Sequence, residues 1–154
     1  MTRTDADTAS DHDTKRADEI ARSAAKHQRV RTAHQTELAE DYVELIAELI
    51  DTYGEARVVD LAERLGVSNA TVNATVRRLA RDGLVSTQKY RSIFLTDDGR
   101  ALAESSAERH ALVRAFLVSL GVDAATADAD AEGIEHHVSD RTLAAFRRHL
   151  RRLK

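Results

Sequence analysis

The sequence predicts a mainly α-helical protein with a small β-hairpin wing, in which an N-terminal winged helix-turn-helix precedes a C-terminal helical dimerisation domain. Three observations support this fold class. Apolar residues recur at helical spacing after residue 30, a glycine turn separates two short helical segments, and two β-branched runs follow them. We expect a tail at residues 1–30, the winged helix-turn-helix at 31–96 and the helical domain at 97–154.

Residues 1–30 are expected to form a disordered or weakly helical tail. Aliphatic side chains are almost absent there apart from Ile20, so the segment buries too little apolar surface to offset the entropy cost of ordering. A first helix is expected to follow and to end near Gly54, because apolar residues then recur at steps of three and four. Those residues are Leu38, Tyr42, Leu45, Ile46, Leu49 and Ile50.

A helix, a tight turn and a second helix are predicted within residues 58–81. The turn is centred on Gly66, and Ser68 is a suitable N-cap for the second helix. Short runs at 84–87 and 92–95 are rich in β-branched residues and flank a polar turn, which indicates a hairpin. Two helices followed by a hairpin are typical of a winged helix-turn-helix.

The remainder of the chain is predicted to be helical. A long helix is expected from Thr96 or Asp97 to Gly121, a second over about 124–137, and a third after the N-cap Ser139. An apolar face left over on so small a unit usually pairs with a copy of itself. We therefore expect a homodimer.

The second helix of the winged motif is expected to read double-stranded DNA. Its outer face carries short polar and basic side chains, whereas Val72, Val76 and Leu79 point the other way. The residues assigned to base edges and phosphates, which include two in the hairpin turn, are Ser68, Asn69, Thr71, Asn73, Arg77, Arg78, Arg81, Lys89 and Arg91.

The distribution of charge agrees with a DNA-binding face. Residues 57–100 carry eight Lys or Arg against five Asp or Glu, within a chain of formal net charge −3. Segregation of positive charge is what phosphate contacts need. The alternative interpretation is that arginines near a helix end only solvate it and favour the negative end of its dipole.

Carboxylates and histidines gather in the segment 130–137. A helix turns by about 100° per residue, so Glu132, Glu135 and His136 of the E-x-x-E-H motif share one face of a helix. Crowded there, these side chains repel one another unless a cation or protons neutralise them. A second acidic pair at the same three-residue step lies on the first helix, and a histidine lies on the long helix. The predicted metal ligands are Asp41, Glu44, His110, Glu132, Glu135 and His136.

The donor types restrict the ion. The chain has no cysteine, and Met1 is its one methionine, so a metal site must use carboxylate oxygen and imidazole nitrogen. Such a set suits Mn2+, Mg2+ or Fe2+. Two histidines match Mg2+ poorly, and Zn2+ prefers four ligands. The sequence therefore predicts Mn2+, with Fe2+ as the alternative.

Composition narrows the class of protein further. No apolar run approaches the roughly 18 residues that span a membrane, and the N-terminus lacks the pattern of a signal peptide, so we expect a cytoplasmic protein. We expect neither an enzyme nor an organic cofactor, because a hydrolase with Glu132 or Glu135 as its base would leave the basic helix and the hairpin unexplained. A metal-independent winged-helix regulator with solvated acidic clusters is the other alternative.

Several motifs resemble the manganese transport regulators of the diphtheria toxin repressor superfamily. They include Asp41-Tyr42-Val43-Glu44, Leu65-Gly66-Val67-Ser68, Arg109-His110 and Glu132-Gly133-Ile134-Glu135-His136-His137. The resemblance implies that metal is held between a winged-helix domain and a dimerisation domain by the six ligands named above. Iron-sensing relatives place methionine at the position of Asp41 and cysteine at that of Glu132, and this chain has neither. A homodimer that binds a near-palindromic operator and represses manganese uptake genes is the expected function.

Overall fold

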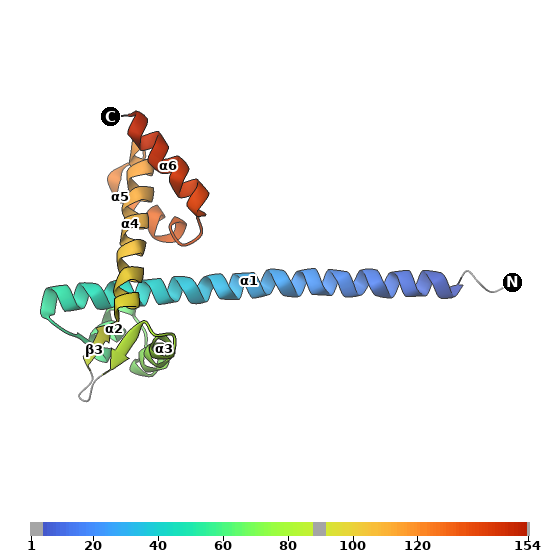
Figure 1. The fold of residues 1–154 in the computed structure, drawn as a ribbon, viewed down its shortest axis with the longest axis horizontal. Coiled ribbons are helices and arrows are strands. Elements are labelled where there is room, and N and C mark those ends of the chain that lie inside the picture. The colour runs from blue at the N-terminus through green and yellow to red at the C-terminus, as the bar shows by residue number, and fades with distance from the viewer. Residues whose placement is uncertain (1–4, 88–91, 154) are drawn as a thin grey trace. The chain divides into compact units, whose positions relative to one another are not determined.

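The computed structural model describes residues 5–87 and 92–153, with side chains from residue 15 onward. It is mostly helical with a three-stranded antiparallel sheet, which confirms the predicted fold class (Figure 1). The elements are α1 (Asp5–Tyr53), β1 (Ala56–Arg57), α2 (Val58–Leu65), α3 (Asn69–Arg81), β2 (Val85–Thr87), β3 (Ser92–Leu95), α4 (Asp97–Ser119), α5 (Ala124–Ile134) and α6 (Asp140–Arg152). None of the described helices is both long enough and apolar enough to cross a membrane. The chain divides into two compact units, residues 1–35 and 36–154.

Helix α1 begins at Asp5, much earlier than the apolar stripe indicated. The scarcity of aliphatic residues in residues 1–30 predicts a disordered or weakly helical tail. Alanine, arginine, lysine and glutamate favour a helix without burial, however, and the chain has no proline to interrupt one. Nearly all side chains in residues 15–35 are exposed. Local propensity and backbone hydrogen bonds therefore account for helix in this segment.

The first hydrophobic core joins the second half of α1 to α2, α3 and the sheet. It takes one face of each element, as the helical and alternating patterns predicted. Its buried members are Tyr42, Ile46, Leu49, Ala56, Leu61, Ala62, Val72, Val76, Leu79, Val85 and Ile93.

Local signals fix the two helices that meet at the glycine turn. Gly66 ends α2 in the left-handed conformation, with φ of 66°. The hydroxyl of Ser68 accepts a hydrogen bond from the backbone N–H of Thr71 and caps α3. The turn and the cap predicted from the sequence are both present.

The sheet contains one strand that the sequence analysis missed. Strand β3 is central and pairs antiparallel with β2, with Val85 opposite Leu95, and with β1, where Ala56 lies opposite Ile93. Because β1 is two residues long, it has no alternating pattern to detect. The predicted hairpin turn at 88–91 lies outside the described residues.

Helices α4, α5 and α6 surround a smaller second core. Val113, Ala131 and Leu143 are its buried residues, and the rings of Phe116 and Phe146 stack against each other with centroids 3.8 Å apart. The three helices begin at side-chain caps, in which Thr96, Asp123 and Ser139 accept backbone N–H groups.

The start of α4 packs directly against the backbone of the turn between α3 and β2. A β-carbon added to Gly99 would lie 1.9 Å from the carbonyl oxygen of Leu84, so only glycine permits this approach. The hydroxyl of Thr96 also donates a hydrogen bond of 2.6 Å to the carbonyl of Gly83. These contacts join the long helix to the winged helix-turn-helix.

We predict that Gly99→Ala lowers the free energy of unfolding by about 3 kcal/mol, because backbone rather than a flexible side chain must move. Gly133→Ala is the matched control, since nothing lies within 4 Å of its added methyl group. The control is expected to change stability by no more than about 1 kcal/mol. Urea unfolding of both variants measures this, and equal midpoints would contradict the close approach.

Candidate metal centre and DNA-reading helix

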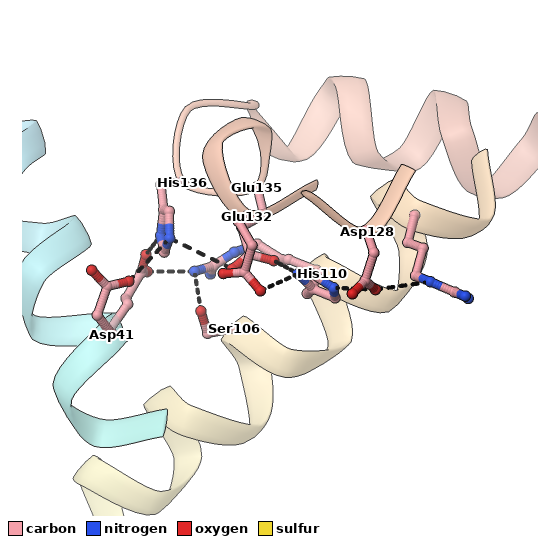
Figure 2. Close-up of polar contacts among 10 residues, drawn as sticks. Asp41, Ser106, His110, Asp128, Glu132, Glu135 and His136 are labelled. Atoms are coloured by element: carbon pink, nitrogen blue, oxygen red, sulfur yellow. Dashed lines mark hydrogen bonds and ion pairs between the residues drawn. The ribbon is translucent and has the colours of Figure 1, made fainter. Parts of the chain in front are cut away.

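Acidic and histidine side chains from α1, α4, α5 and the turn after α5 converge at one place. Figure 2 shows Asp41 on α1, His110 on α4, and Glu132, Glu135 and His136 near the end of α5 turned toward one another. These five are predicted ligands from the sequence analysis.

Among the described residues, His110, Glu132 and Glu135 form a group that could hold one metal ion. Each offers one ligand atom, and these atoms lie within 4.8 Å of one another. Nδ1 of His110 is 3.5 Å from Oε1 of Glu132 and 3.2 Å from Oε2 of Glu135. The group has the size and the nitrogen and oxygen donors that a divalent cation requires.

His136 extends this group toward α1. Its Nε2 lies 3.3 Å from Oδ1 of Asp41 and 3.5 Å from Oε1 of Glu135. Glu135 therefore faces His110 with one oxygen and His136 with the other. With a side chain that is 1% exposed, Glu135 is the buried centre of the cluster.

Glu44 lies one helical turn after Asp41 on α1 and is half-buried. Its Oε1 is buried and has no hydrogen-bond partner, and the same is true of Oε2 of Glu135. Buried carboxylate oxygens without donors are costly. A divalent cation would satisfy both oxygens, so the residues present fit a bound metal ion.

The carboxylates influence one another's protonation. Burial, together with the negative charge of Glu44, raises the pKa of Glu135 to about 7. Burial and the nearby charges of Glu37 and Glu44 also raise the pKa of Asp41, despite the opposing effect of His136. At neutral pH the cluster thus retains protons that a metal ion would displace.

The backbone at the cluster differs from the prediction. The sequence predicts that Glu132, Glu135 and His136 share one face of a helix that ends at about His137. Instead α5 ends at Ile134 and Glu135 is its C-cap. The N–H of His137 bonds to the carbonyl of Ile134, a tighter i to i+3 step, so the chain turns here. Glu135 still has helical backbone angles, with φ of −58° and ψ of −34°, so His136 follows it in the direction that a helix gives.

Two residues that sequence reasoning assigned no role also line the cluster. Glu40 is buried, and its oxygens accept hydrogen bonds from His136 and Arg109. The one sequence signal for Glu40 is its position three residues before Val43, which places it beside the apolar face of α1. The sequence signal for Arg109 is its position beside His110.

Helix α3 presents most of the predicted DNA-contacting residues to solvent. Its buried side chains are Val72, Thr75, Val76 and Leu79. Arg78 is half-buried, so it is less accessible to a phosphate than its predicted role requires. Lys89 and Arg91 lie outside the described residues. The exposed predicted residues are Ser68, Asn69, Thr71, Asn73, Arg77 and Arg81.

An exposed polar helix in a winged helix-turn-helix, joined to a cluster of metal-binding donors, defines a metal-dependent transcriptional regulator. Comparison with protein families agrees. Residues 34–93 match the iron dependent repressor N-terminal DNA binding domain, and residues 96–154 match the iron dependent repressor metal binding and dimerisation domain. The chain belongs to the iron-dependent repressor family, whose members are transcriptional regulators and not enzymes.

Individual relatives carry more specific names. The chain is 55% identical over 118 residues to the transcriptional regulator MntR of Escherichia coli O6:H1, covering 77% of this chain and 76% of the relative. Among solved structures, it is similar to the manganese regulator SloR, with a TM-score of 0.64 and 32% identity over 73% of this chain. It is also similar to a manganese-dependent transcriptional repressor in complex with manganese, with a TM-score of 0.63 and 36% identity over 73% of this chain. The matches cover 53% and 52% of those two chains, about half their length.

We predict that Glu135→Gln stabilises the metal-free protein at pH 8. Because the folded protein holds a proton on Glu135 more tightly than the unfolded chain does, metal-free stability falls as pH rises from about 4.5 to about 7. The neutral amide removes this loss, and Tm should rise by about 2–4 °C for each kcal/mol regained. Thermal unfolding in chelator checks this. The two proteins should converge at pH 5, and a variant less stable at pH 8 would contradict the raised pKa.

Proposed function

We propose that this protein is a manganese-responsive transcriptional repressor whose metal ion is held by Asp41, Glu44, His110, Glu132, Glu135 and His136. The observation that carries the proposal is the buried carboxylate of Glu135, which faces two imidazoles and has an oxygen without a hydrogen-bond partner. A positive ion would interact with this oxygen and take the place of the missing hydrogen-bond donor.

Oxygen and imidazole donors favour Mn2+ over softer metals. The chain has no cysteine, and the two positions occupied by Asp41 and Glu132 carry oxygen donors instead of sulfur donors. The names of the similar proteins, which are a regulator called MntR and two manganese regulators, support the same ion. Fe2+ takes similar donors and is the alternative that a metal titration must exclude.

The proposed ligands come from both parts of the protein. Asp41 and Glu44 lie on α1, which shares a core with the DNA-reading helix α3, and the other four lie on α4, α5 and the turn that follows. An ion held by both sets restrains the reading helix relative to the dimerisation helices. This restraint removes part of the entropy cost of binding DNA, so metal binding and DNA binding strengthen each other.

We further propose that the active form is a homodimer in the cytoplasm, and that residues 31–96 and 97–154 form its two domains. Twofold symmetry places two reading helices against two half-sites, so the operator is near-palindromic. Repression of manganese uptake genes when Mn2+ is bound is the regulation that fits such a sensor.

The proposal predicts that Mn2+ strengthens operator binding, and that Asp41→Ala or Glu135→Ala abolishes the gain. Each substitution should weaken Mn2+ binding by more than the roughly 10–100-fold typical of residues that only support a ligand. Asp51→Ala, an exposed acid further along α1, is the matched control and should bind Mn2+ normally. Calorimetry measures the ion, and mobility shifts with Mn2+, Fe2+ or Zn2+ on an operator selected from random DNA measure the response. Equal operator affinity with metal and with chelator would instead indicate a metal-independent regulator.

The DNA-reading assignment has its own test. Asn73→Ala or Arg77→Ala on α3 should each cost about 1–3 kcal/mol on the selected operator and relax the preference for one base pair. Arg64→Ala is the control, because that arginine lies on α2 and pairs with Glu48 at 3.0 Å. Competition binding with operators changed at single base pairs checks this. A uniform loss on all sequences would assign Asn73 and Arg77 to phosphates.

A further inference from the structure

Glu40 is a buried carboxylate whose two oxygens are both in use. Its side chain is 6% exposed. One oxygen, Oε2, lies 2.6 Å from Nδ1 of His136, and the other accepts a hydrogen bond from Nη2 of Arg109. Glu40 therefore differs from Glu44 and Glu135, each of which has a buried oxygen without a partner. Both oxygens of Glu40 already contact donor groups of the protein.

The contact with His136 determines which ring nitrogen carries the proton. An ionised carboxylate only accepts hydrogen bonds, so Nδ1 of His136 must be the donor. In the neutral ring the lone pair then lies on Nε2, the atom that faces Asp41 at 3.3 Å and Glu135 at 3.5 Å. Metal ions bind a histidine nitrogen through that lone pair.

Arg109 holds the carboxylate in place. Its guanidinium contacts Glu40 and lies 3.4 Å from the hydroxyl of Ser106, which is fully buried on α4. The arginine places a positive charge beside this buried carboxylate. Glu40 is thus fixed from α4 on one side and presents its other oxygen to His136.

We propose that Glu40 is a positioning residue for metal recognition, which fixes the tautomer and ring orientation of His136 so that Nε2 points into the site. This inference rests on the proposed function of the cluster. A carboxylate behind a metal-binding histidine typically contributes a factor of about 10–100 in metal affinity. Glu40 supplies that factor from α1, the helix that also carries Asp41 and Glu44.

His110, the second histidine of the cluster, also has a carboxylate beside its ring, but this contact is more exposed. Nε2 of His110 lies 3.3 Å from Oδ1 of Asp128, and the same oxygen is 2.9 Å from Nε of Arg114. Asp128 is 60% exposed, so water competes for both contacts. Because Glu40 is buried and Asp128 is exposed, the contact between Glu40 and His136 is the one of the two that controls a histidine tautomer.

The first test reads the tautomer directly in the metal-free protein. Long-range proton and nitrogen-15 NMR spectra, recorded above the pH at which His136 loses its charge, distinguish Nδ1–H from Nε2–H. We expect Nδ1–H in the native chain and in Glu40→Gln, whose amide oxygen still accepts the bond, and a shift toward Nε2–H in Glu40→Ala. The same tautomer in all three proteins would overturn the inference. A role of Glu40 in packing alone does not move this signal.

The second test measures Mn2+ affinity by calorimetry on the full chain. Glu40→Ala should bind Mn2+ about 10–100-fold more weakly, and Glu40→Gln should lie between Glu40→Ala and the native chain. Glu48→Gln is the control, because Glu48 is an exposed glutamate two turns further along α1 whose ion pair with Arg64 lies outside the cluster. Native affinity in a folded Glu40→Ala variant would overturn the inference. If the native chain itself took up no Mn2+, the proposed function would fail, and the tautomer spectra would still decide the role of Glu40.

Discussion

Repulsion among carboxylates that cannot all be ionised together is the constraint on which the site depends. Glu135 is buried between His110 and His136, and Glu44 is close enough to raise its pKa further. The fold holds these groups in place with α1 on one side and the α5 turn on the other. Without a cation the cluster must keep protons or lose stability. The geometry that weakens the metal-free protein is therefore also the source of its affinity for a divalent ion.

The carboxylates of the cluster fall into two groups, which differ in whether nearby protein groups compensate their negative charge. Glu40 has Arg109 and His136 as donors, so its charge is compensated within the protein. Burial and neighbouring carboxylates raise the pKa values of Asp41 and Glu135. Compensation by fixed protein groups makes a carboxylate part of the framework. Its absence leaves a carboxylate ready to exchange a proton for a metal ion.

The sequence predicted the winged helix-turn-helix and the type of site, but not its local construction. The Gly66 turn, the Ser68 cap and the apolar stripes were readable because they depend on neighbours in the chain. The end of α5 at Ile134 was not, because Glu135, His136 and His137 are compatible with helix and only their contacts across the fold favour a turn. Glu40 escaped notice for the same reason: its partners are 69 and 96 residues away. The sequence predicted too little helix in residues 5–30, because the prediction depended on buried apolar residues. Helix propensity alone is enough to form a helix there.

Packing explains how events at the cluster reach the DNA-reading helix. Asp41 precedes Tyr42, and Tyr42 lies in the same buried core as Val72 and Val76 of α3. Tightly packed cores move as units and transmit small displacements of one element to its neighbours. A restraint on the acidic face of α1 is consequently a restraint on α3. Because the opposite side of the cluster belongs to α4 and the α5 turn, the proposed ion acts on the orientation of the reading helix without contacting it.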